Sequence, residues 1–352
     1  MPGAHAVWQK RLAPVLGPAG WIYARLMRCR AGMYRNGRLP AWRPPAFCIS
    51  VGNISWGGAG KTPLCEWILK RSLERGAVPA LLSRGYGADP PRLPYTVRPD
   101  SPVRQAGDEP LMLARSCPRA AVVIDPRRAR GGRLVRRMFS PGLFVLDDGF
   151  QHLGVQRDLD LVLLKPEDLR GDWNVVLPAG AWREGSFALQ RASAFLLNAE
   201  PSCFENLRGL IRRRLGALGK PVFSFQIRPV RLKRVVDGTE RELAQDGPYL
   251  LVSGVGHPQG LERSVSDAIG AKPAAHLAFP DHHFYSPRDW RQIRSEATRL
   301  GCRMVLCTPK DEVKLAEYAD SAVWSIDSEL RFGPWEYGQI PFEEWFEQAL
   351  SG

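Results

Sequence analysis

Acidic side chains are absent from the first 65 residues, although the chain of 352 residues carries 36 Asp and Glu against 49 Lys and Arg. Residues 1–46 carry eight basic side chains: Lys10, Arg11, Arg25, Arg28, Arg30, Arg35, Arg38 and Arg43. The formal net charge of +13 therefore leaves 13 − 8 = +5 for the other 306 residues. Because that body is nearly neutral, a uniformly basic nucleic-acid binder is disfavoured and no nucleic-acid partner is expected.

Cysteine pairs of the C-x-x-C type are also missing. The seven cysteines are odd in number and scattered, at positions 29, 48, 65, 117, 203, 302 and 307. This pattern predicts neither a disulfide framework nor a zinc site, and it is typical of a protein in a reducing cytoplasm.

A long apolar run is lacking as well. The longest uncharged apolar stretch near the start, Leu12 to Ala24, has 13 residues and contains Pro14 and Pro18, whereas a bilayer-spanning helix needs about 20. We therefore expect neither a transmembrane helix nor a cleaved signal peptide.

The segment 21–35 instead has the pattern of an amphipathic helix. At 100° per residue its basic side holds Arg25, Arg28 and Arg35, with Trp21 among them, and its apolar side holds Ile22, Leu26, Met27, Met33 and Tyr34, with Arg30 among them. Such a helix can lie on an anionic membrane surface. The alternative is a helix packed on the protein's own core with its arginines in solvent. We take residues 1–45 as an amphipathic membrane-surface segment.

After Pro44 and Pro45 the sequence has the composition and the alternation of an α/β protein, with 44% hydrophobic and 24% charged residues. Strands are expected at 46–51, 78–83, 121–124, 143–146, 159–164, 194–197, 249–253, 274–279 and 304–307. Helices are expected at 62–75, after 109, and near 130–139, 258–269, 287–300 and 310–318. This alternation predicts parallel-rich sheets covered by helices on both faces.

A change of pattern near residues 221–235 marks a domain boundary. Two extended pieces separated by Pro229 are expected there, and a second α/β series begins after them. The predicted domains are therefore 46–225 and 226–352, the first of which contains a phosphate-loop core.

That core is indicated by the segment 50–63, SVGNISWGGAGKTP, which follows a strand and opens a helix. Glycines let backbone N–H groups close around phosphate oxygens, a lysine adds a positive charge, and a threonine hydroxyl can bind Mg²⁺. The predicted ATP-binding residues are Ser55, Trp56, Gly57, Gly58, Ala59, Gly60, Lys61 and Thr62. Ser55 replaces the first glycine of the usual G-x-x-x-x-G-K-[ST] pattern.

Two acids follow the strand at 143–146 and complete this pattern. A carboxylate at the carboxyl end of a buried strand can hold the metal of a phosphate-loop enzyme, which predicts Asp147 as a Mg²⁺ ligand and leaves Asp148 to face the reaction centre. A loop of the dimeric membrane-associated ATPases would carry a lysine before its two glycines. Trp56 occupies that position, which argues against that class.

The motifs taken together are similar to those of a known family. Their order is SVGNISWGGAGKTP (50–63), LSRGYG (82–87), GDEP (107–110), LDDGFQH (146–152), DLDLVLL (158–164), LPAG-x-x-RE (177–184), FPDHHFYS (279–286) and TPKD (308–311). In this order they resemble the tetraacyldisaccharide 4′-kinases, the lipid A 4′-kinases of Gram-negative bacteria.

The resemblance implies transfer of the ATP γ-phosphoryl group to the 4′-hydroxyl of a tetraacyldisaccharide 1-phosphate in lipid A biosynthesis. It also implies two α/β/α domains joined by a short two-stranded linker, with the active site between them, and peripheral attachment to the cytoplasmic face of the inner membrane. The implied cofactors are ATP and Mg²⁺, and the implied partners are the lipid disaccharide and the anionic membrane surface. No obligate protein partner is implied.

The resemblance also implies roles for single residues. Asp108 matches the proposed catalytic base and His282 its polarising partner, although Asp108 could serve only as a helix cap and His283 is an alternative imidazole. Glu184 matches a further metal carboxylate, but Gly185 replaces the proline that usually follows it. The cleft-lining candidates are Arg84, Gln151, His152 and Arg183. Lys310 and Asp311 could contact the nucleotide or lock the two domains, and their role stays open. The arginines between 127 and 137 either meet the 1-phosphate of the substrate or anionic lipid, or form a solvated helix face.

Two rival hypotheses remain at this point. A membrane-bound NTPase switch would hydrolyse ATP without an acceptor, and it would leave Asp108 and His282 without a task. A phosphate-loop protein that binds nucleic acid would need a more basic body than the one found here.

Overall fold

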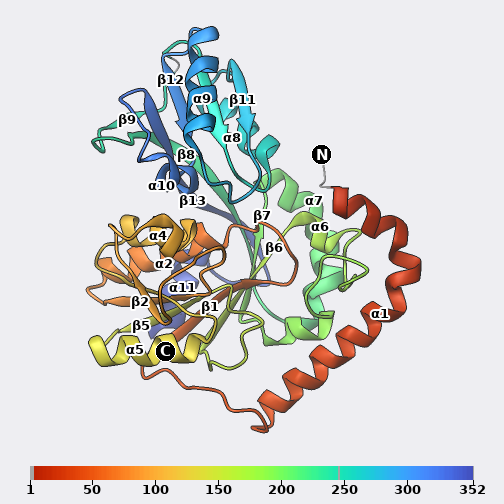
Figure 1. Ribbon diagram of the computed structural model, residues 1–352. Coiled ribbons are helices and arrows are strands. Elements are labelled where there is room, and N and C mark those ends of the chain that lie inside the picture. Colours follow the sequence, from red (N-terminus) through yellow and green to blue (C-terminus); the bar gives the residue numbers. More distant parts are fainter. Residues whose placement is uncertain (1–3, 245, 352) are drawn as a thin grey trace. The chain divides into compact units, whose positions relative to one another are not determined.

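The computed structural model describes residues 4–244 and 246–351 and divides the chain into two units (Figure 1). Unit 1 consists of the described residues of Met1–Arg84, Arg119–Gln226 and Arg331–Gly352, and unit 2 of the described residues of Gly85–Pro118 and Ile227–Leu330. The units therefore differ from the two contiguous domains predicted above. The reason is that two long strands, β8 (Val222–Arg234) and β13 (Val323–Glu336), each continue from one unit into the other.

Unit 1 is built on a parallel sheet. Its strand order is β7 (Ala194–Asn198), β6 (Leu159–Leu164), β1 (Phe47–Asn53), β5 (Leu143–Asp147), β2 (Pro79–Ser83) and β4 (Ala121–Ile124), and the first residues of β8 pair with β7. These strands are continuous apolar runs and are almost entirely buried, as expected for a parallel sheet covered on both faces. Parallel pairing brings all their carboxyl ends to one edge of the sheet.

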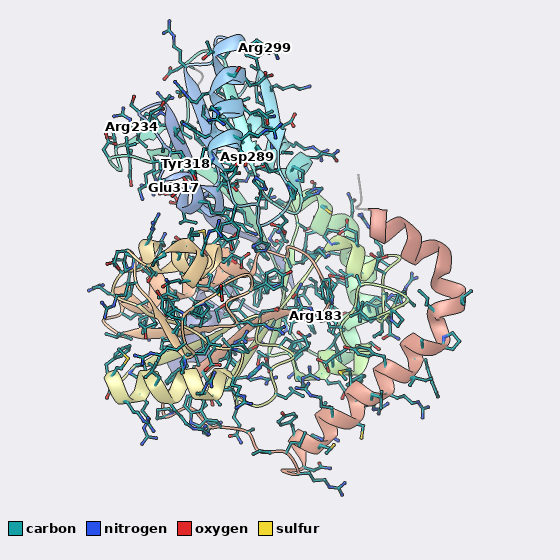
Figure 2. The ribbon with its side chains drawn as sticks, in the orientation of Figure 1. Arg183, Arg234, Asp289, Arg299, Glu317 and Tyr318 are labelled. Carbon is teal, nitrogen blue, oxygen red and sulfur yellow. The ribbon has the colours of Figure 1, made fainter. Side chains whose placement is uncertain are left out.

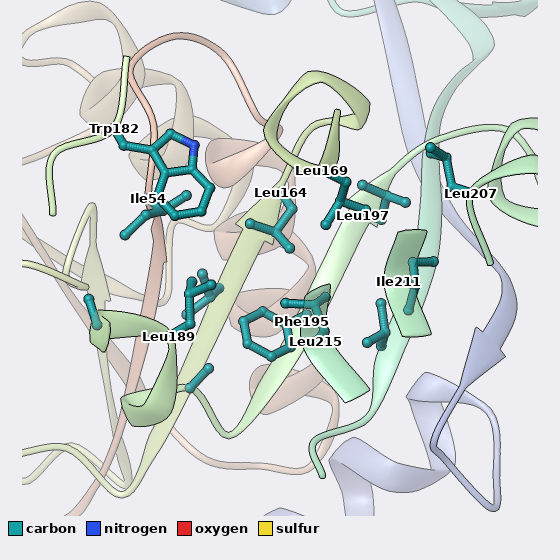
Figure 3. Close-up of a cluster of buried hydrophobic side chains, with 14 of the residues drawn as sticks. Ile54, Leu164, Leu169, Trp182, Leu189, Phe195, Leu197, Leu207, Ile211 and Leu215 are labelled. Atoms are coloured by element: carbon teal, nitrogen blue, oxygen red, sulfur yellow. The ribbon is translucent and has the colours of Figure 1, made fainter. Parts of the chain in front are cut away.

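Two apolar clusters hold helices against this sheet. One cluster joins β6 and β7 to α7 (Pro201–Leu215) and includes Trp182 and Ile54, which lie side by side in Figure 3. The other lies under α5 (Arg128–Met138). The remaining helices of unit 1 are α2 (Lys61–Glu74), α6 (Pro166–Leu169) and α11 (Phe342–Ser351), with the 3₁₀ turns η1 (Ser186–Arg191) and η2 (Gly216–Leu218).

Unit 2 has its own α/β core. Its parallel strands run in the order β11 (Ala275–Ala278), β10 (Tyr249–Ser253), β12 (Met304–Cys307) and β13, followed by β8 and the antiparallel β9 (Glu240–Glu242). Its helices are α3 (Val103–Ala106), α4 (Asp108–Ser116), α8 (Pro258–Ile269), α9 (Pro287–Arg299) and α10 (Pro309–Leu315), and β3 (Tyr95–Val97) precedes them. The predicted α/β class with mostly parallel strands is confirmed.

Helix α1 (Ala4–Arg35) is longer than the predicted segment 21–35, and it runs through Pro14 and Pro18. An interior proline removes a helical hydrogen bond and bends the helix, and α1 is visibly bent in Figure 1. Among the described residues of the chain, this helix and the others fall short of the length and apolarity that a bilayer crossing requires.

The two interpretations of this segment are a helix on a membrane surface and a helix packed on the protein's own core. Each fits a different side of α1. Tyr23 and Ala24 pack against the cluster of Figure 3, whereas Ile22 and Leu26 are 54% and 59% exposed. Arg30, which interrupts the apolar side in projection, donates to the carbonyl oxygen of Gln151 at 3.3 Å. An inner face therefore binds the protein core, and an outer apolar face remains exposed.

The segment near residues 221–235 is one strand and not two extended pieces. Strand β8 pairs with β7 through residues 222–225 and with β9 through residues 231–233. Pro229 lies between these two stretches, so neither pairing needs the N–H group that proline lacks. The proline signal therefore does not interrupt the strand.

Candidate active site

The phosphate loop connects β1 to α2 in unit 1. Gly57 and Gly60 have φ angles of 99° and 91°, a left-handed conformation that glycine adopts without steric conflict. Lys61 and Thr62 are the first two residues of α2, and the N-cap residue Gly60 makes no side-chain cap hydrogen bond. The first N–H groups of a helix have no intrahelical partner and favour an anion. The loop and the helix start therefore have a geometry suited to a phosphate group, and ATP binding by residues 55–62 stays a prediction.

Lys61 is held at the carboxyl end of β1. Its Nζ donates to Oδ1 of Asn53 at 3.0 Å and lies 3.4 Å from Oδ1 of Asp148. Asn53 was not among the predicted site residues. Its position at the end of a buried strand directly before the glycines is the signal that could have identified it.

The two acids after β5 have different environments. Asp147 is buried, accepts the hydroxyl hydrogen of Ser83 at 2.7 Å and lies 4.0 Å from Sγ of Cys65, one turn into α2. Asp148 has a φ of 49°, which is uncommon for a non-glycine residue and frequent at functional sites. Burial would raise the pKa of Asp148, but the charges of Lys61 and Arg183 outweigh it and hold that pKa below its ordinary value.

Arg183 reaches Asp148 because its segment pairs with the loop. The N–H of Trp56 donates to Ala181 O at 2.9 Å, and the N–H of Arg183 donates to Ile54 O at 2.8 Å. Nη1 of Arg183, labelled in Figure 2, then lies 2.9 and 2.8 Å from the two carboxylate oxygens of Asp148. Two predicted residues from distant motifs are thus brought into direct contact.

A buried carboxylate, that of Asp168, also contacts the phosphate loop. Asp168 accepts hydrogen bonds from the Ser55 hydroxyl at 3.0 Å, from Nε1 of Trp182 at 3.0 Å and from the N–H of Lys165 at 2.8 Å. Burial is the main reason that the pKa of Asp168 is raised. Asp168 was missed by the sequence analysis, because nothing in the motif around it indicates a contact with residue 55.

The predicted metal ligands fit Mg²⁺ in kind, since a hydroxyl and a carboxylate are oxygen donors. Thr62 is the second residue of α2, and Asp147, at the end of β5, lies 4.0 Å from Sγ of Cys65 one turn further along that helix. Glu184 is buried in a two-point ion pair with Arg191, at 2.7 and 3.1 Å, and its role as a ligand stays a prediction. Among residues 4–244 and 246–351, no three His, Cys, Asp or Glu side chains converge on one point suited to a metal. Mg²⁺ sites that use one or two carboxylates plus phosphates do not need such a group.

The other cleft-lining candidates follow the same strand ends. Arg84 is exposed directly after β2, and Nε2 of Gln151 donates to Asn53 O at 3.0 Å. Burial, followed by the charges of Arg128 and Arg157, lowers the pKa of His152 to about 4. His152 is therefore neutral at pH 7.

The arginines of 127–137 divide into two groups. Arg128 is buried and donates to the carbonyl oxygen of Asp147 at 3.2 Å, and Arg130 pairs with Asp125. The exposed members are Arg127, Arg130, Arg133, Arg136 and Arg137. The solvated surface therefore describes every arginine of the cluster except the buried Arg128.

Asp108 lies in unit 2 as the first residue of α4. The N-cap of this helix is Gly107, with φ 79° and ψ 152°, so Asp108 is not the cap that one interpretation expected. Its carboxylate is buried and accepts the N–H of Glu109 at 3.0 Å. This carboxylate is thus held at a helix N-terminus, where negative charge is stabilised.

His282 contacts Asp108 directly. Its Nδ1 lies 3.1 and 3.0 Å from the two carboxylate oxygens, whereas Nε2 of the neighbouring His283 lies 3.1 Å from Asp289. His282 also has a φ of 60°, a second positive value at a predicted site residue. Of the two imidazoles, His282 is therefore the one that the structure places beside Asp108.

This contact shifts the pKa of both partners. Burial works to raise the pKa of Asp108, but the His282 hydrogen bond and the charges of Lys310 and Lys314 lower it below its ordinary value. The same hydrogen bond raises the pKa of His282 against the effect of burial. At neutral pH Asp108 is a carboxylate that can accept a proton.

Lys314 on α10 is a further residue that the sequence analysis missed. It is almost fully buried, with Nζ 3.5 Å from Asp108 and 3.5 Å from Asp311. Asp311 in turn accepts from the Tyr285 hydroxyl and the N–H of Gly254, both at 3.0 Å. The buried charges are thus balanced, which is the usual condition for burying them.

Together, a parallel sheet, a glycine loop between β1 and α2, a lysine at the helix start and an acid at the end of the neighbouring strand define a phosphate-loop kinase. Comparisons with known proteins agree. The family model described as tetraacyldisaccharide-1-P 4′-kinase, LpxK, matches residues 12–350. The chain belongs to this family.

Three relatives illustrate the similarity. The tetraacyldisaccharide 4′-kinase of Nitratidesulfovibrio vulgaris is 45% identical over 346 residues, 98% of this chain and 96% of that protein. That of Oleidesulfovibrio alaskensis is 44% identical over 355 residues, 98% of each chain. The crystal structure of the "apo" form of LpxK from Aquifex aeolicus in complex with ATP is 28% identical with a TM-score of 0.74, covering 97% of this chain and 98% of the other.

Proposed function

We propose that this chain is an ATP-dependent kinase that phosphorylates the 4′-hydroxyl of a tetraacyldisaccharide 1-phosphate and forms the 4′-phosphorylated lipid A precursor. The observation that carries the proposal is the family match over residues 12–350, supported by an intact phosphate loop and a buried Asp108–His282 pair. A switch that only hydrolyses ATP would have no use for that pair.

ATP binds through the loop residues 55–62. Its phosphates are held by the N–H groups of the glycine loop and of the first turn of α2, and Nζ of Lys61 adds the positive charge. To do so Lys61 exchanges its contacts with Asn53 and Asp148 for phosphate oxygens. Asp148 then keeps Arg183 at the loop, so a cation remains available for charge that develops on the transferred group.

The Thr62 hydroxyl and the Asp147 carboxylate would hold Mg²⁺, with Glu184 as a further candidate. An ion held there would supply positive charge to offset that of the phosphates. The protein keeps Asp147 ready for this role, because the Ser83 hydroxyl fixes one carboxylate oxygen at 2.7 Å.

Asp108 is the general base for the acceptor hydroxyl. It is ionised at neutral pH, and His282 and the N–H of Glu109 fix its orientation. A positioned base of this kind is worth about 10²–10⁴ in rate. The acceptor loses its proton to Asp108 as its oxygen attacks the γ-phosphorus, and ADP leaves.

The acceptor is a lipid, and α1 supplies a surface for reaching it. Its outer face exposes Ile22 and Leu26, and Arg25 lies over the Trp21 ring at 4.1 Å. Apolar and aromatic side chains among arginines suit the boundary of an anionic membrane. We therefore propose peripheral attachment at the cytoplasmic face of the inner membrane.

The test is a product assay. Purified protein with Mg·ATP and tetraacyldisaccharide 1-phosphate in mixed detergent micelles is expected to yield a 4′-phosphorylated product, detected by mass spectrometry together with one ADP per product. The matched control is Asp108→Asn in the same micelles. ATP hydrolysis by folded protein without a phosphorylated lipid would overturn the proposal in favour of a switch.

A further inference from the structure

We propose that Lys310 is a positioning residue that holds His282 as the neutral imidazole with its proton on Nδ1, so that Asp108 keeps its basicity. The inference rests on the proposed function and goes beyond it, because neither the motifs nor the comparisons give Lys310 a role.

The ammonium group of Lys310 contacts three polar side chains. Its Nζ lies 2.8 Å from Oδ1 of Asp281, 3.2 Å from Nε2 of His282 and 3.4 Å from Oε1 of Glu109. An ammonium group has three hydrogens to donate and no lone pair to accept with. Two of these contacts, to Asp281 and to His282, have hydrogen-bond geometry, and the Glu109 and Asp108 carboxylates at 3.4 and 3.9 Å add ion pairs.

The protonation state of the His282 ring follows from the fact that an ammonium group only donates hydrogen bonds. Since Lys310 can only donate, its contact with Nε2 is a hydrogen bond only when Nε2 carries a lone pair. The proton of a neutral ring is then on Nδ1, where it points at the Asp108 carboxylate 3.0 Å away. One lysine thus fixes which ring nitrogen donates and which accepts.

Lys310 remains a cation despite being half buried. Burial lowers the pKa of its amine, but the carboxylates of Glu109 and Asp108 outweigh burial and raise that pKa above its ordinary value. Lys310 also fixes the strained backbone at His282, because Oδ1 of Asp281 accepts both from Lys310 and from the N–H of His282 at 3.0 Å.

Charged groups of three elements contact His282 or its two partners Asp108 and Lys310. Asp108 and Glu109 belong to α4, Lys310 and Lys314 to α10, and Asp281 to the loop of His282 itself. The uncharged Tyr86 ring lies 5.2 Å from the imidazole between centroids. The Asp108 contact raises the pKa of His282 and the charge of Lys310 lowers it. We give the Lys310 contact more weight because a doubly protonated ring would bring two cations to 3.2 Å without a hydrogen bond between them.

The protonation state of His282 affects how strong a base Asp108 is. A second positive charge on His282 would lower the pKa of Asp108 further and weaken it as a proton acceptor. The charge of Lys310 itself is offset by Asp281 and Glu109. A neutral His282 therefore orients Asp108 through one hydrogen bond without adding a cation beside it.

The first experiment observes the ring directly. Full-length protein labelled with ¹⁵N-histidine is measured by two-bond ¹H–¹⁵N correlation at pH 7.5, and His282→Asn identifies the His282 signals. The expected spectrum has a protonated Nδ1 and an unprotonated Nε2. A proton on Nε2, alone or together with one on Nδ1, would overturn the proposal.

The second experiment removes the ammonium group. Lys310→Met is expected to move the acidic limb of the kcat profile up by about one pH unit, because His282 then becomes protonated at a higher pH. KM for ATP is expected to stay within twofold. Lys310→Arg should restore part of the shift, and the exposed Lys272→Met is the matched control. An unchanged acidic limb in folded Lys310→Met contradicts the inference.

The two experiments separate this inference from the proposed function. The spectrum needs no lipid or ATP, so an inactive wild-type protein would refute the kinase proposal and leave the state of His282 measurable. If Lys310→Met does not fold by circular dichroism, Lys310→Gln replaces it, and the wild-type spectrum decides by itself.

Discussion

Ser55 donates its hydroxyl hydrogen to Asp168 across 3.0 Å, and the two residues are 113 positions apart in the chain. Ser55 stands where related loops usually have a glycine, and it gives this loop a side-chain tie that glycine cannot make. Trp182 donates to the other oxygen of the same carboxylate. The loop that receives phosphate is thus anchored by a buried charge.

Ser55→Ala is therefore expected to weaken both stability and ATP binding. Hydrogen bonds to charged groups contribute roughly 1.5–3 kcal/mol, so we expect the free energy of unfolding in urea to fall by about 2 kcal/mol and KM for ATP to rise several-fold. The exposed Ser321→Ala is the control. Unchanged stability and unchanged KM would show that the tie does not support the loop.

Lys61→Met is expected to weaken binding of Mg·ATP by tenfold or more in calorimetry, because the loop loses the charge that faces the phosphates. Lys70→Met removes a lysine from the exposed face of the same helix, where it pairs with Glu66 at 2.7 Å, and should bind normally. Equal affinities for the two variants would reject the phosphate-binding role of Lys61.

Asp108→Asn keeps the shape of the side chain and removes the base. We expect kcat to fall by about 10²–10⁴ while the affinity for ATP changes little, measured by steady-state kinetics in mixed micelles. Asp100→Asn, at an exposed position of unit 2, should behave as wild type. A kcat near the wild-type value would mean that another group accepts the proton.

His152 makes the protein sensitive to acid. Its folded-state pKa of about 4 lies below the ordinary value of 6.5, so between about pH 6.5 and pH 4 the unfolded chain binds a proton that the folded chain does not. This contribution to stability is complete above pH 6.5 and is lost as the pH falls through that window. His152→Gln should flatten the fall of Tm between pH 7 and pH 5, and His257→Gln should not. Parallel Tm curves for His152→Gln and wild type would contradict the assignment.

Replacing both Ile22 and Leu26 by serine removes apolar surface from the outer face of α1. Since burying such side chains is worth up to about 1.5–3 kcal/mol each, we expect binding to anionic phospholipid vesicles to weaken roughly tenfold or more in sedimentation assays. Solubility in buffer and ATP binding should persist. Val236→Ser, at another exposed apolar position, is the control, and equal vesicle binding by all three proteins would remove α1 from the membrane contact.

The sequence was most informative where a pattern is local. Apolar runs located most of the buried strands in both units, and the glycines before Lys61 identified the loop because left-handed backbone and phosphate contact both favour glycine. The Asp108–His282 contact joins residues 174 positions apart, and only the family resemblance indicated it. Nothing in the spacing of those two motifs requires them to meet.

Contacts that depend on tertiary packing were missed. Asn53, Asp168 and Lys314 carry no motif of their own, and each acquires its role from a strand end or a helix face that brings a partner close. Strand β13 and helix α11 were also missed, because their charged and aromatic residues follow no clean alternation. The bounds of the two units differ from the predicted domains for a related reason, since local patterns do not show that a strand leaves one unit and enters another.

The last segment of the chain packs on helix α2, near the chain's start, and this order affects folding during translation. Trp67 on α2 packs against Phe332, Phe342 and Phe346, with ring centroids 5.2, 5.6 and 5.1 Å apart, and the ribosome makes these phenylalanines only after residues 227–330. Until then the helix that starts with Lys61 has an uncovered aromatic side. A nascent chain released before residue 331 would expose this apolar aromatic surface. We therefore expect chaperones to bind such truncated products.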